Sequence, residues 1–126
     1  MDALTYLAII HAHEKNWGNA EECITNALKI AQNISQLYRL SKVFIVGGNI
    51  YLAQDKFEEA VHYYQEAERV SEKSGHKQRQ HTALLQLTNL YAKMGLKSEW
   101  NTYANKLFNI QQELNLQSED EIYVIN

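Results

Sequence analysis

The chain has 126 residues, a formal net charge of −3 and a hydrophobic content of 45%, with no proline and five glycines. A chain of this length fits one domain, and its mild acidity gives no general attraction to nucleic acid or to an anionic membrane surface. The lone Cys23 excludes an internal disulfide framework, and no apolar run reaches the roughly 18 residues that span a membrane, so we expect a cytoplasmic domain.

Apolar residues recur at helical spacing six times along the chain. We expect helices over about residues 2–14, 19–33, 36–54, 56–74, 77–94 and 97–115. A break at residues 16–19 separates the first two, while Gly75 and Gly95 are free to take the left-handed conformation that closes a helix. Links of two to five residues within each pair predict antiparallel helical hairpins.

The C-terminal segment differs from the helical part. Residues 1–115 form one expected domain, with repeats at about 1–35, 36–75 and 76–115. The tail, residues 116–126, begins with an acidic stretch and ends in an apolar one. Two interpretations of the tail stay open, since it is either disordered or docked by its apolar end in a groove.

Residues that lie forty positions apart match along the chain. The matching sets are Leu4, Phe44 and Leu84; Ile10, Ile50 and Leu90; and Ile30, Val70 and Ile110. A fixed period of this size is typical of stacked helical repeats, which offer a groove to another chain. We therefore predict an all-α, right-handed alpha-alpha superhelix, a solenoid of three antiparallel helical hairpins. In this fold Tyr51 and Tyr91 should have like surroundings.

Residues 44–67 carry the most regular pattern of aromatic and small side chains. The pattern consists of Phe44, Gly47, Gly48, Tyr51, Phe57, Ala60, Tyr64 and Ala67. It resembles the tetratricopeptide repeat, in which small residues let two helices approach closely and rings fill the space between hairpins. Residues 4–27 and 84–107 match more loosely, with His11 where Tyr is usual and Trp100 where Ala is usual. The period of forty is similar to that of bacterial peptide-sensing regulators of the Rap and PlcR type.

The resemblance implies a protein- or peptide-binding module, the C-terminal portion of a larger bacterial regulator such as a transcriptional regulator. The first helix of each hairpin would line the concave groove. The expected peptide- or partner-binding residues are Lys42, Asn49, Gln86, Asn89 and Lys93. Asn49 and Asn89 take the same place in consecutive repeats, and a carboxamide can pair with a peptide unit whatever the ligand's side chains. Replacing both with Ala should weaken binding without unfolding; the plainer interpretation is two surface amides.

The first helix is apolar on nearly all sides. Between residues 3 and 10, only Thr5 and the hydroxyl of Tyr6 are polar. Two faces can pack on neighbouring helices, and a third would remain exposed. We therefore expect either a longer array or a homodimer formed through the first helix; a complete short chain with half-exposed side chains is the other interpretation. The alternative function is a structural scaffold or self-association module with no peptide ligand.

We expect neither an enzyme nor a metal or cofactor site. The five histidines show no ligand spacing, and no Gly-rich phosphate loop or nucleophile elbow occurs. His11 and His13 are two residues apart on a helix, so they point in different directions. The expected partner is a peptide or protein, with no direct nucleic acid contact and no membrane contact.

Overall fold

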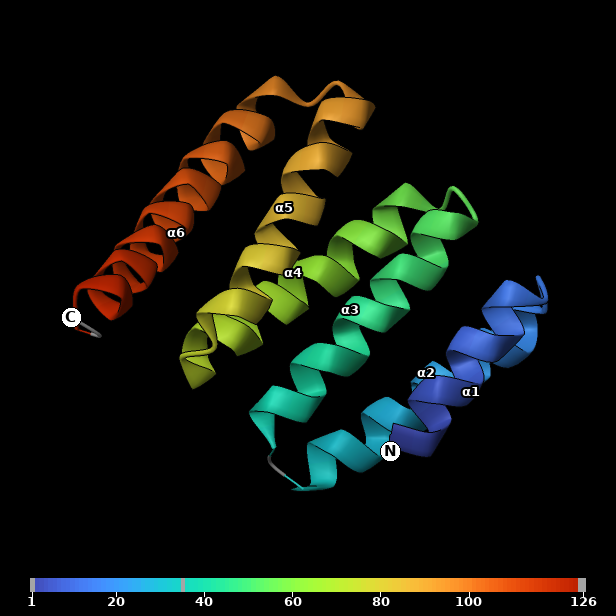
Figure 1. The fold of residues 1–126 in the computed structure, drawn as a ribbon. Helices are drawn as coiled ribbons and strands as arrows, with labels where there is room; N and C mark the ends of the chain where they lie inside the picture. Colours follow the sequence, from blue (N-terminus) through green and yellow to red (C-terminus); the bar gives the residue numbers. More distant parts are fainter. Residues whose placement is uncertain (1, 35, 125–126) are drawn as a thin grey trace.

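The computed structural model describes residues 2–34 and 36–124, with the side chains of residues 2–31 and 36–115. In this part of the chain, six helices follow one another and no strand occurs (Figure 1). The helices are α1 (Asp2–His13), α2 (Trp17–Ile34), α3 (Leu37–Ala53), α4 (Phe57–Ser74), α5 (Lys77–Met94) and α6 (Lys97–Val124). The predicted all-α fold is confirmed.

Consecutive helices pair into three hairpins, α1–α2, α3–α4 and α5–α6, which lie side by side. The second helix of one hairpin also contacts the first helix of the next, as α2 does with α3 and α4 does with α5. In addition, α1 contacts α3 and α3 contacts α5. The three first helices are therefore neighbours on one face of the stack (Figure 1).

The turn inside each hairpin has the same backbone geometry. Lys15, Asp55 and Gly95 lie forty residues apart and have positive φ angles of 60°, 60° and 73°. The residue after each one donates its N–H to a carbonyl five residues back: Asn16 to His11 (2.8 Å), Lys56 to Tyr51 (3.0 Å) and Leu96 to Tyr91 (3.0 Å). This is a left-handed helix closure. The forty-residue period thus extends to the backbone, although only the third turn uses glycine.

The start of α2 and the end of α6 differ from the sequence-based boundaries. We expected a break at residues 16–19, but the N–H of Ala20 already donates to the carbonyl of Asn16 (3.1 Å), so α2 begins at Trp17. We expected the sixth helix to end near residue 115, but α6 continues to Val124 because no glycine or proline stops it. The expectation that the apolar end of the tail docks in a groove involves side chains after residue 115, which lie outside the described residues.

The core consists of layers between hairpins. One cluster joins the first hairpin to the second, and another joins the second to the third. The first includes Ala8, Ile24, Val43 and Ile50, and the second Tyr64, Leu87, Leu90 and Tyr91. Each hairpin therefore depends on its neighbours for burial, as in other repeat proteins.

Small residues allow α3 and α4 to pack closely. A Cβ atom added to Gly48 would lie 2.6 Å from the ring of Tyr64, and one added to Gly47 would lie 2.7 Å from the ring of Tyr63. Ala60, on the facing helix, is fully buried. The expectation that Gly48 and Ala60 permit a close helix approach is confirmed, since no larger residue fits at Gly48 without a shift of the ring.

Tyr51 and Tyr91 have the like surroundings that the repeat predicts. The ring of Tyr51 lies 5.1 Å from that of Tyr63 at an interplanar angle of 43°. The ring of Tyr91 lies 5.2 Å from that of Tyr103 at 41°. Tyr63 and Tyr103 are themselves forty residues apart. The second and third hairpins therefore reproduce one another at the level of individual ring contacts.

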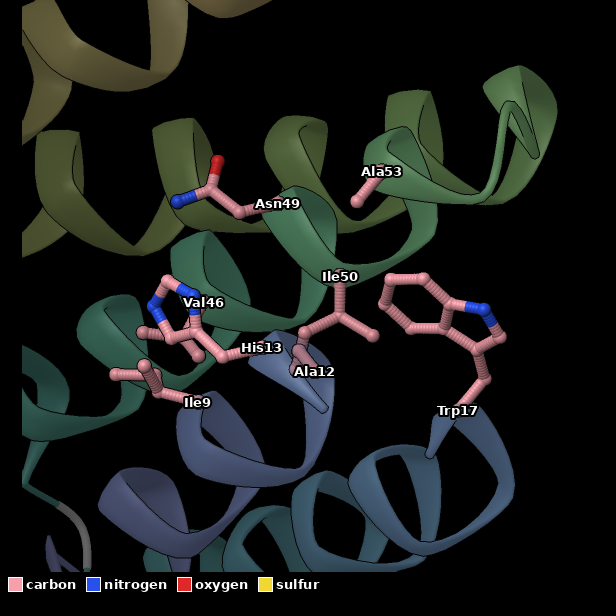
Figure 2. A pocket seen from close by; sticks show the side chains of 8 residues that line it. All are labelled: Ile9, Ala12, His13, Trp17, Val46, Asn49, Ile50 and Ala53. Atoms are coloured by element: carbon pink, nitrogen blue, oxygen red, sulfur yellow. The ribbon is translucent and has the colours of Figure 1, made fainter. Parts of the chain in front are cut away.

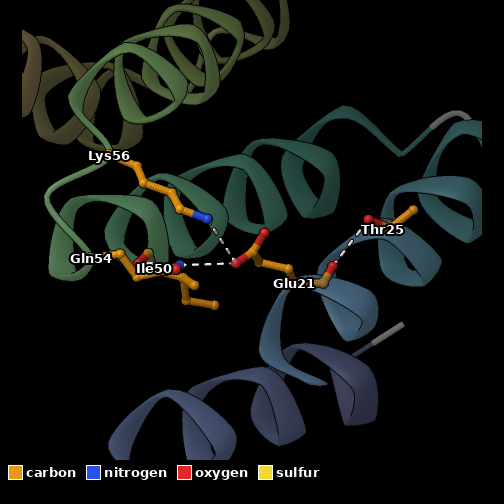
Figure 3. A network of polar contacts seen from close by, with 5 residues as sticks. All are labelled: Glu21, Thr25, Ile50, Gln54 and Lys56. Carbon is orange, nitrogen blue, oxygen red and sulfur yellow. Dashed lines mark hydrogen bonds and ion pairs between the residues drawn. The ribbon is translucent and has the colours of Figure 1, made fainter. Parts of the chain in front are cut away.

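A polar network joins the first two hairpins (Figure 3). Gln54 Nε2 donates to Glu21 Oε2 at 3.1 Å and to the carbonyl oxygen of Ile50 at 3.3 Å. Lys56 Nζ lies 3.5 Å from the same Glu21 oxygen, and the hydroxyl of Thr25 donates to the Glu21 carbonyl at 3.0 Å. The ion pair is partly exposed, so it adds little stability on its own. The network links the turn after α3 to α2.

One face of α1 remains uncovered. Tyr6, Leu7 and Ile10 are 55%, 44% and 52% exposed. Forty residues on, Gly47 and Ile50 are buried against the first hairpin. The expectation of a third, exposed apolar face on the first helix is confirmed. In the second and third hairpins, the corresponding face of the first helix is covered by the hairpin that precedes it.

The packed tyrosines should make the fold sensitive to alkali. Burial is the main cause that raises the pKa of Tyr51, Tyr63, Tyr64 and Tyr91 above the ordinary 10.0. Above about pH 10 the unfolded chain releases tyrosine protons that the folded chain retains, so stability is full below that pH and falls as the pH rises. Urea midpoints measured from neutral to alkaline pH should decrease, and tyrosinate absorbance should appear together with unfolding. Constant midpoints through this range would contradict the prediction.

Candidate functional site

A hollow of about 330 Å³ lies between α1 and α3 (Figure 2). Its lining residues are Ile9, Ala12, His13, Trp17, Val46, Asn49, Ile50 and Ala53. Most are apolar, and Figure 2 shows the Trp17 ring at one end and His13 near Val46. The polar groups, from His13 and Asn49, stand among apolar walls. Such a hollow suits an apolar side chain that arrives with polar backbone attached.

A second, smaller hollow of about 160 Å³ lies between α3 and α5. Its lining residues are Leu52, Gln86, Asn89, Leu90 and Lys93. Lys93 Nζ lies 5.1 Å from the centre of the Phe57 ring, which holds the cation over the α4 side of this hollow. The two hollows follow one another across α1, α3 and α5, so they form one discontinuous groove, hereafter the groove.

The structure separates the five predicted binding residues into three places. Gln86, Asn89 and Lys93 come together in the α3–α5 hollow. Asn49 lies in the neighbouring α1–α3 hollow. Lys42 lines neither hollow, because its ammonium group lies over the ring of Tyr6 at 4.8 Å and donates to the Tyr6 hydroxyl at 3.4 Å.

Asn49 and Asn89 differ in their surroundings. The hydroxyl of Tyr64, which is fully buried, donates a hydrogen bond to Asn49 Oδ1. Residue 104, forty positions after Tyr64, is Ala and has no hydroxyl to donate to Asn89. Asn49 is therefore tied to the core through its oxygen, whereas its carboxamide nitrogen is the group suited to a ligand. Asn89 is exposed on α5 and lines the smaller hollow.

Sequence reasoning missed some lining residues and included one that lies elsewhere. Trp17 was placed in a break, but it begins α2 and closes one end of the larger hollow. Lys42, one of the expected binding residues, lines neither hollow, and the nearby Ile45 packs on the buried cluster around Phe44 and Val70. The signal for Trp17 was present, since a large ring just before a helical stripe often packs beside the helix end.

Comparison with known proteins identifies the repeat. A model of the tetratricopeptide repeat family matches residues 1–73, more than half of the chain. The chain belongs to the tetratricopeptide repeat family. Tetratricopeptide repeats are general protein–protein interaction modules, and this chain therefore carries an interaction domain.

A solved structure shares this tetratricopeptide fold. The crystal structure of BtubC (BKLC) from P. vanneervenii superposes with a TM-score of 0.78 at 18% sequence identity. The alignment covers 90% of this chain and 46% of BtubC, so the chain spans about half the length of that protein. At this identity the likeness shows the fold alone. No curated protein matches the chain.

The described part of this tetratricopeptide domain contains neither a membrane-spanning helix nor a cluster of potential metal ligands. Within it, no helix is both long and apolar enough to cross a membrane. Among the same residues, His, Cys, Asp and Glu side chains do not gather in groups of three that could hold a metal ion. The chemistry that the groove offers is apolar contact, carboxamide hydrogen bonding and positive charge.

Proposed function

We propose that this domain binds an extended peptide, or a peptide segment of a protein partner, in the groove, and that it acts by binding and not by catalysis. The observation that supports the proposal is the succession of two hollows across the first helices of the three hairpins. Each hollow pairs apolar walls with the Asn that takes the same place in its repeat, Asn49 in the larger and Asn89 in the smaller, and the smaller also contains Gln86. An extended chain presents side chains and peptide groups in the same alternating manner.

Apolar contacts and amide hydrogen bonds would contribute to recognition in different ways. Apolar side chains that enter the larger hollow stabilise the complex by roughly 25 cal/mol for each Å² of surface removed from water. The amide groups add less net free energy, because they replace hydrogen bonds to water. They fix the register of the bound chain, since an unpaired peptide group in the groove would be costly.

A groove-filling variant tests the proposal. Peptides are selected from a random phage-displayed library on the wild-type chain. Their affinities are then measured for the wild type and for Ala53→Trp, which places a large ring in the larger hollow. We expect binding to fall at least about tenfold, the equivalent of roughly 1.4 kcal/mol. The matched control is Asn26→Trp, on an exposed position of α2 away from the groove, which should bind as wild type. Equal binding by all three chains, or no enriched peptide, would refute groove binding.

The wider context is also a proposal. We propose that the domain is the C-terminal portion of a larger bacterial regulator similar to the Rap and PlcR type, with a location in the cytoplasm. The support is the forty-residue period and the carboxamides at matching places in consecutive repeats. Sequencing the gene upstream of this segment tests it, since a DNA-binding helix-turn-helix there would indicate a transcriptional regulator. An upstream region without any regulator-type domain would contradict it.

One observation favours a second candidate function, self-association. The uncovered α1 face, formed by Tyr6, Leu7 and Ile10, has the apolar character of the faces that the later hairpins bury. Two copies paired through this face would form a scaffold that needs no peptide. Sedimentation velocity over a range of concentrations should then show a dimer that Leu7→Glu abolishes. A monomer at all concentrations would exclude this candidate.

A further inference from the structure

Acidic residues are distributed unequally between the first and second helices of the hairpins, whereas Lys and Arg occur on both. The groove-lining helices α3 and α5 contain no Asp or Glu, and α1 contains only Asp2. The helix behind them, α4, contains five glutamates. The chain as a whole has a net charge of −3. A ligand that approaches the groove therefore meets a positive surface on an acidic protein, which attracts negative charge.

Four cations of the groove-lining helices, Arg39, Lys42, Arg79 and Lys93, stand outside the ion pairs of the described residues. The ion pairs in the described part of the chain are Lys56 with Glu21, Arg69 with Glu66 and Lys77 with Glu113. Lys42, Arg79 and Lys93 each lie over an aromatic ring and are hereafter the groove cations; Lys93 lines the smaller hollow, whereas Lys42 and Arg79 lie on α3 and α5 outside both hollows. Arg79 reaches from α5 to α3, where its Nη1 donates to the carbonyl of Tyr38 at 2.9 Å. The groove cations thus keep their charge uncompensated.

Each groove cation is held over an aromatic ring. The charged atoms lie 4.8 Å from the ring centre of Tyr6 for Lys42, 4.2 Å from that of Tyr38 for Arg79 and 5.1 Å from that of Phe57 for Lys93. A ring face attracts a cation without cancelling its charge. The side chains are thereby ordered before a ligand arrives, which lowers the entropy cost of binding. The arrangement is suited to carboxylates.

We infer that the partner segment is acidic and carries at least one bulky apolar side chain. This inference rests on the proposed function and names the class of ligand. The apolar side chain enters the α1–α3 hollow, and carboxylates of the same segment accept charge-assisted hydrogen bonds from the groove cations. Asn49 and Asn89 contact the peptide groups between them. A neutral or basic segment would leave the three cations without partners.

Peptides selected from a random phage-displayed library provide the first test. We expect the enriched sequences to carry a net negative charge together with Leu, Ile, Phe or Trp, and their affinity to fall as salt is raised above roughly 0.1 M, because salt screens exposed charges. Enrichment of neutral or basic sequences that Ala53→Trp still weakens would overturn the acidic class while leaving groove binding intact. The absence of any enriched sequence would count against both.

Charge reversal provides the second test. For a selected acidic peptide, the double variant Lys42→Glu with Lys93→Glu should lower affinity at least about tenfold, since like charges would then face each other. The matched control reverses Lys29 and Lys73, which are exposed on α2 and α4, and changes the net charge by the same amount. The control should bind within about twofold of wild type. Equal losses in both double variants would refute specific recognition by the groove cations. Circular dichroism of both verifies folding.

Discussion

Gly48→Ala is expected to lower the free energy of unfolding by about 2 kcal/mol, because an added methyl group overpacks a close helix contact. The new Cβ would lie 2.6 Å from the Tyr64 ring, which is fully buried and cannot move outward. Alanine gains about 1 kcal/mol over glycine in helix propensity, which offsets part of the cost. Urea unfolding followed by far-UV circular dichroism measures the difference.

A second glycine supplies the control. Gly18 lies in the first turn of α2, and apart from its chain neighbours and the backbone of its own helix no heavy atom would lie within 4 Å of a Cβ added there. Gly18→Ala should leave stability unchanged or raise it slightly. Adding Tyr64→Leu to Gly48→Ala removes the ring atoms that clash, so the methyl group should cost less in the Tyr64→Leu background than in the wild type. If Gly48→Ala unfolds at the wild-type urea concentration, the close approach of α3 and α4 is not needed for stability.

The repeat could be found from the sequence because each hairpin buries the same positions. The forty-residue period located the hairpins, and the ring pairs Tyr51–Tyr63 and Tyr91–Tyr103 confirm it in three dimensions. The helix ends were predicted less accurately, since backbone hydrogen bonding decides them. The extension of α6 to Val124 illustrates this, because polar residues without glycine or proline continue a helix as readily as they end it.

The groove could be only partly predicted. The repeat placed Asn49 and Asn89 on the first helices of their hairpins, and each lines a hollow there. The contact of Lys42 with Tyr6 depends on how closely α1 approaches α3, which no local pattern encodes. The absence of acidic residues from residues 37–53 and 77–94 is visible in the sequence, but it becomes meaningful only once these helices are known to lie on one face.

Asn49→Ala and Asn89→Ala should differ in stability although they occupy the same place in consecutive repeats. Removing Asn49 leaves the buried hydroxyl of Tyr64 without its acceptor, which costs about 2 kcal/mol. Removing Asn89 leaves no such group, because residue 104 is Ala, so the change should stay within about 0.5 kcal/mol. The chain is still expected to remain folded when both are replaced, but the hydrogen bond from Tyr64 adds the prediction that Asn49→Ala lowers its stability.

A double-mutant cycle separates the hydrogen bond from other effects of the substitution. In the Tyr64→Phe background no hydroxyl remains, so Asn49→Ala should cost about as little as Asn89→Ala does. The measurement is the urea midpoint of the four chains of the cycle. A full cost of Asn49→Ala that persists in the Tyr64→Phe background would show that the amide stabilises α3 by another contact. Peptide binding is then best tested with Asn89→Ala, because any loss of affinity in that variant reports on the groove while the core stays intact.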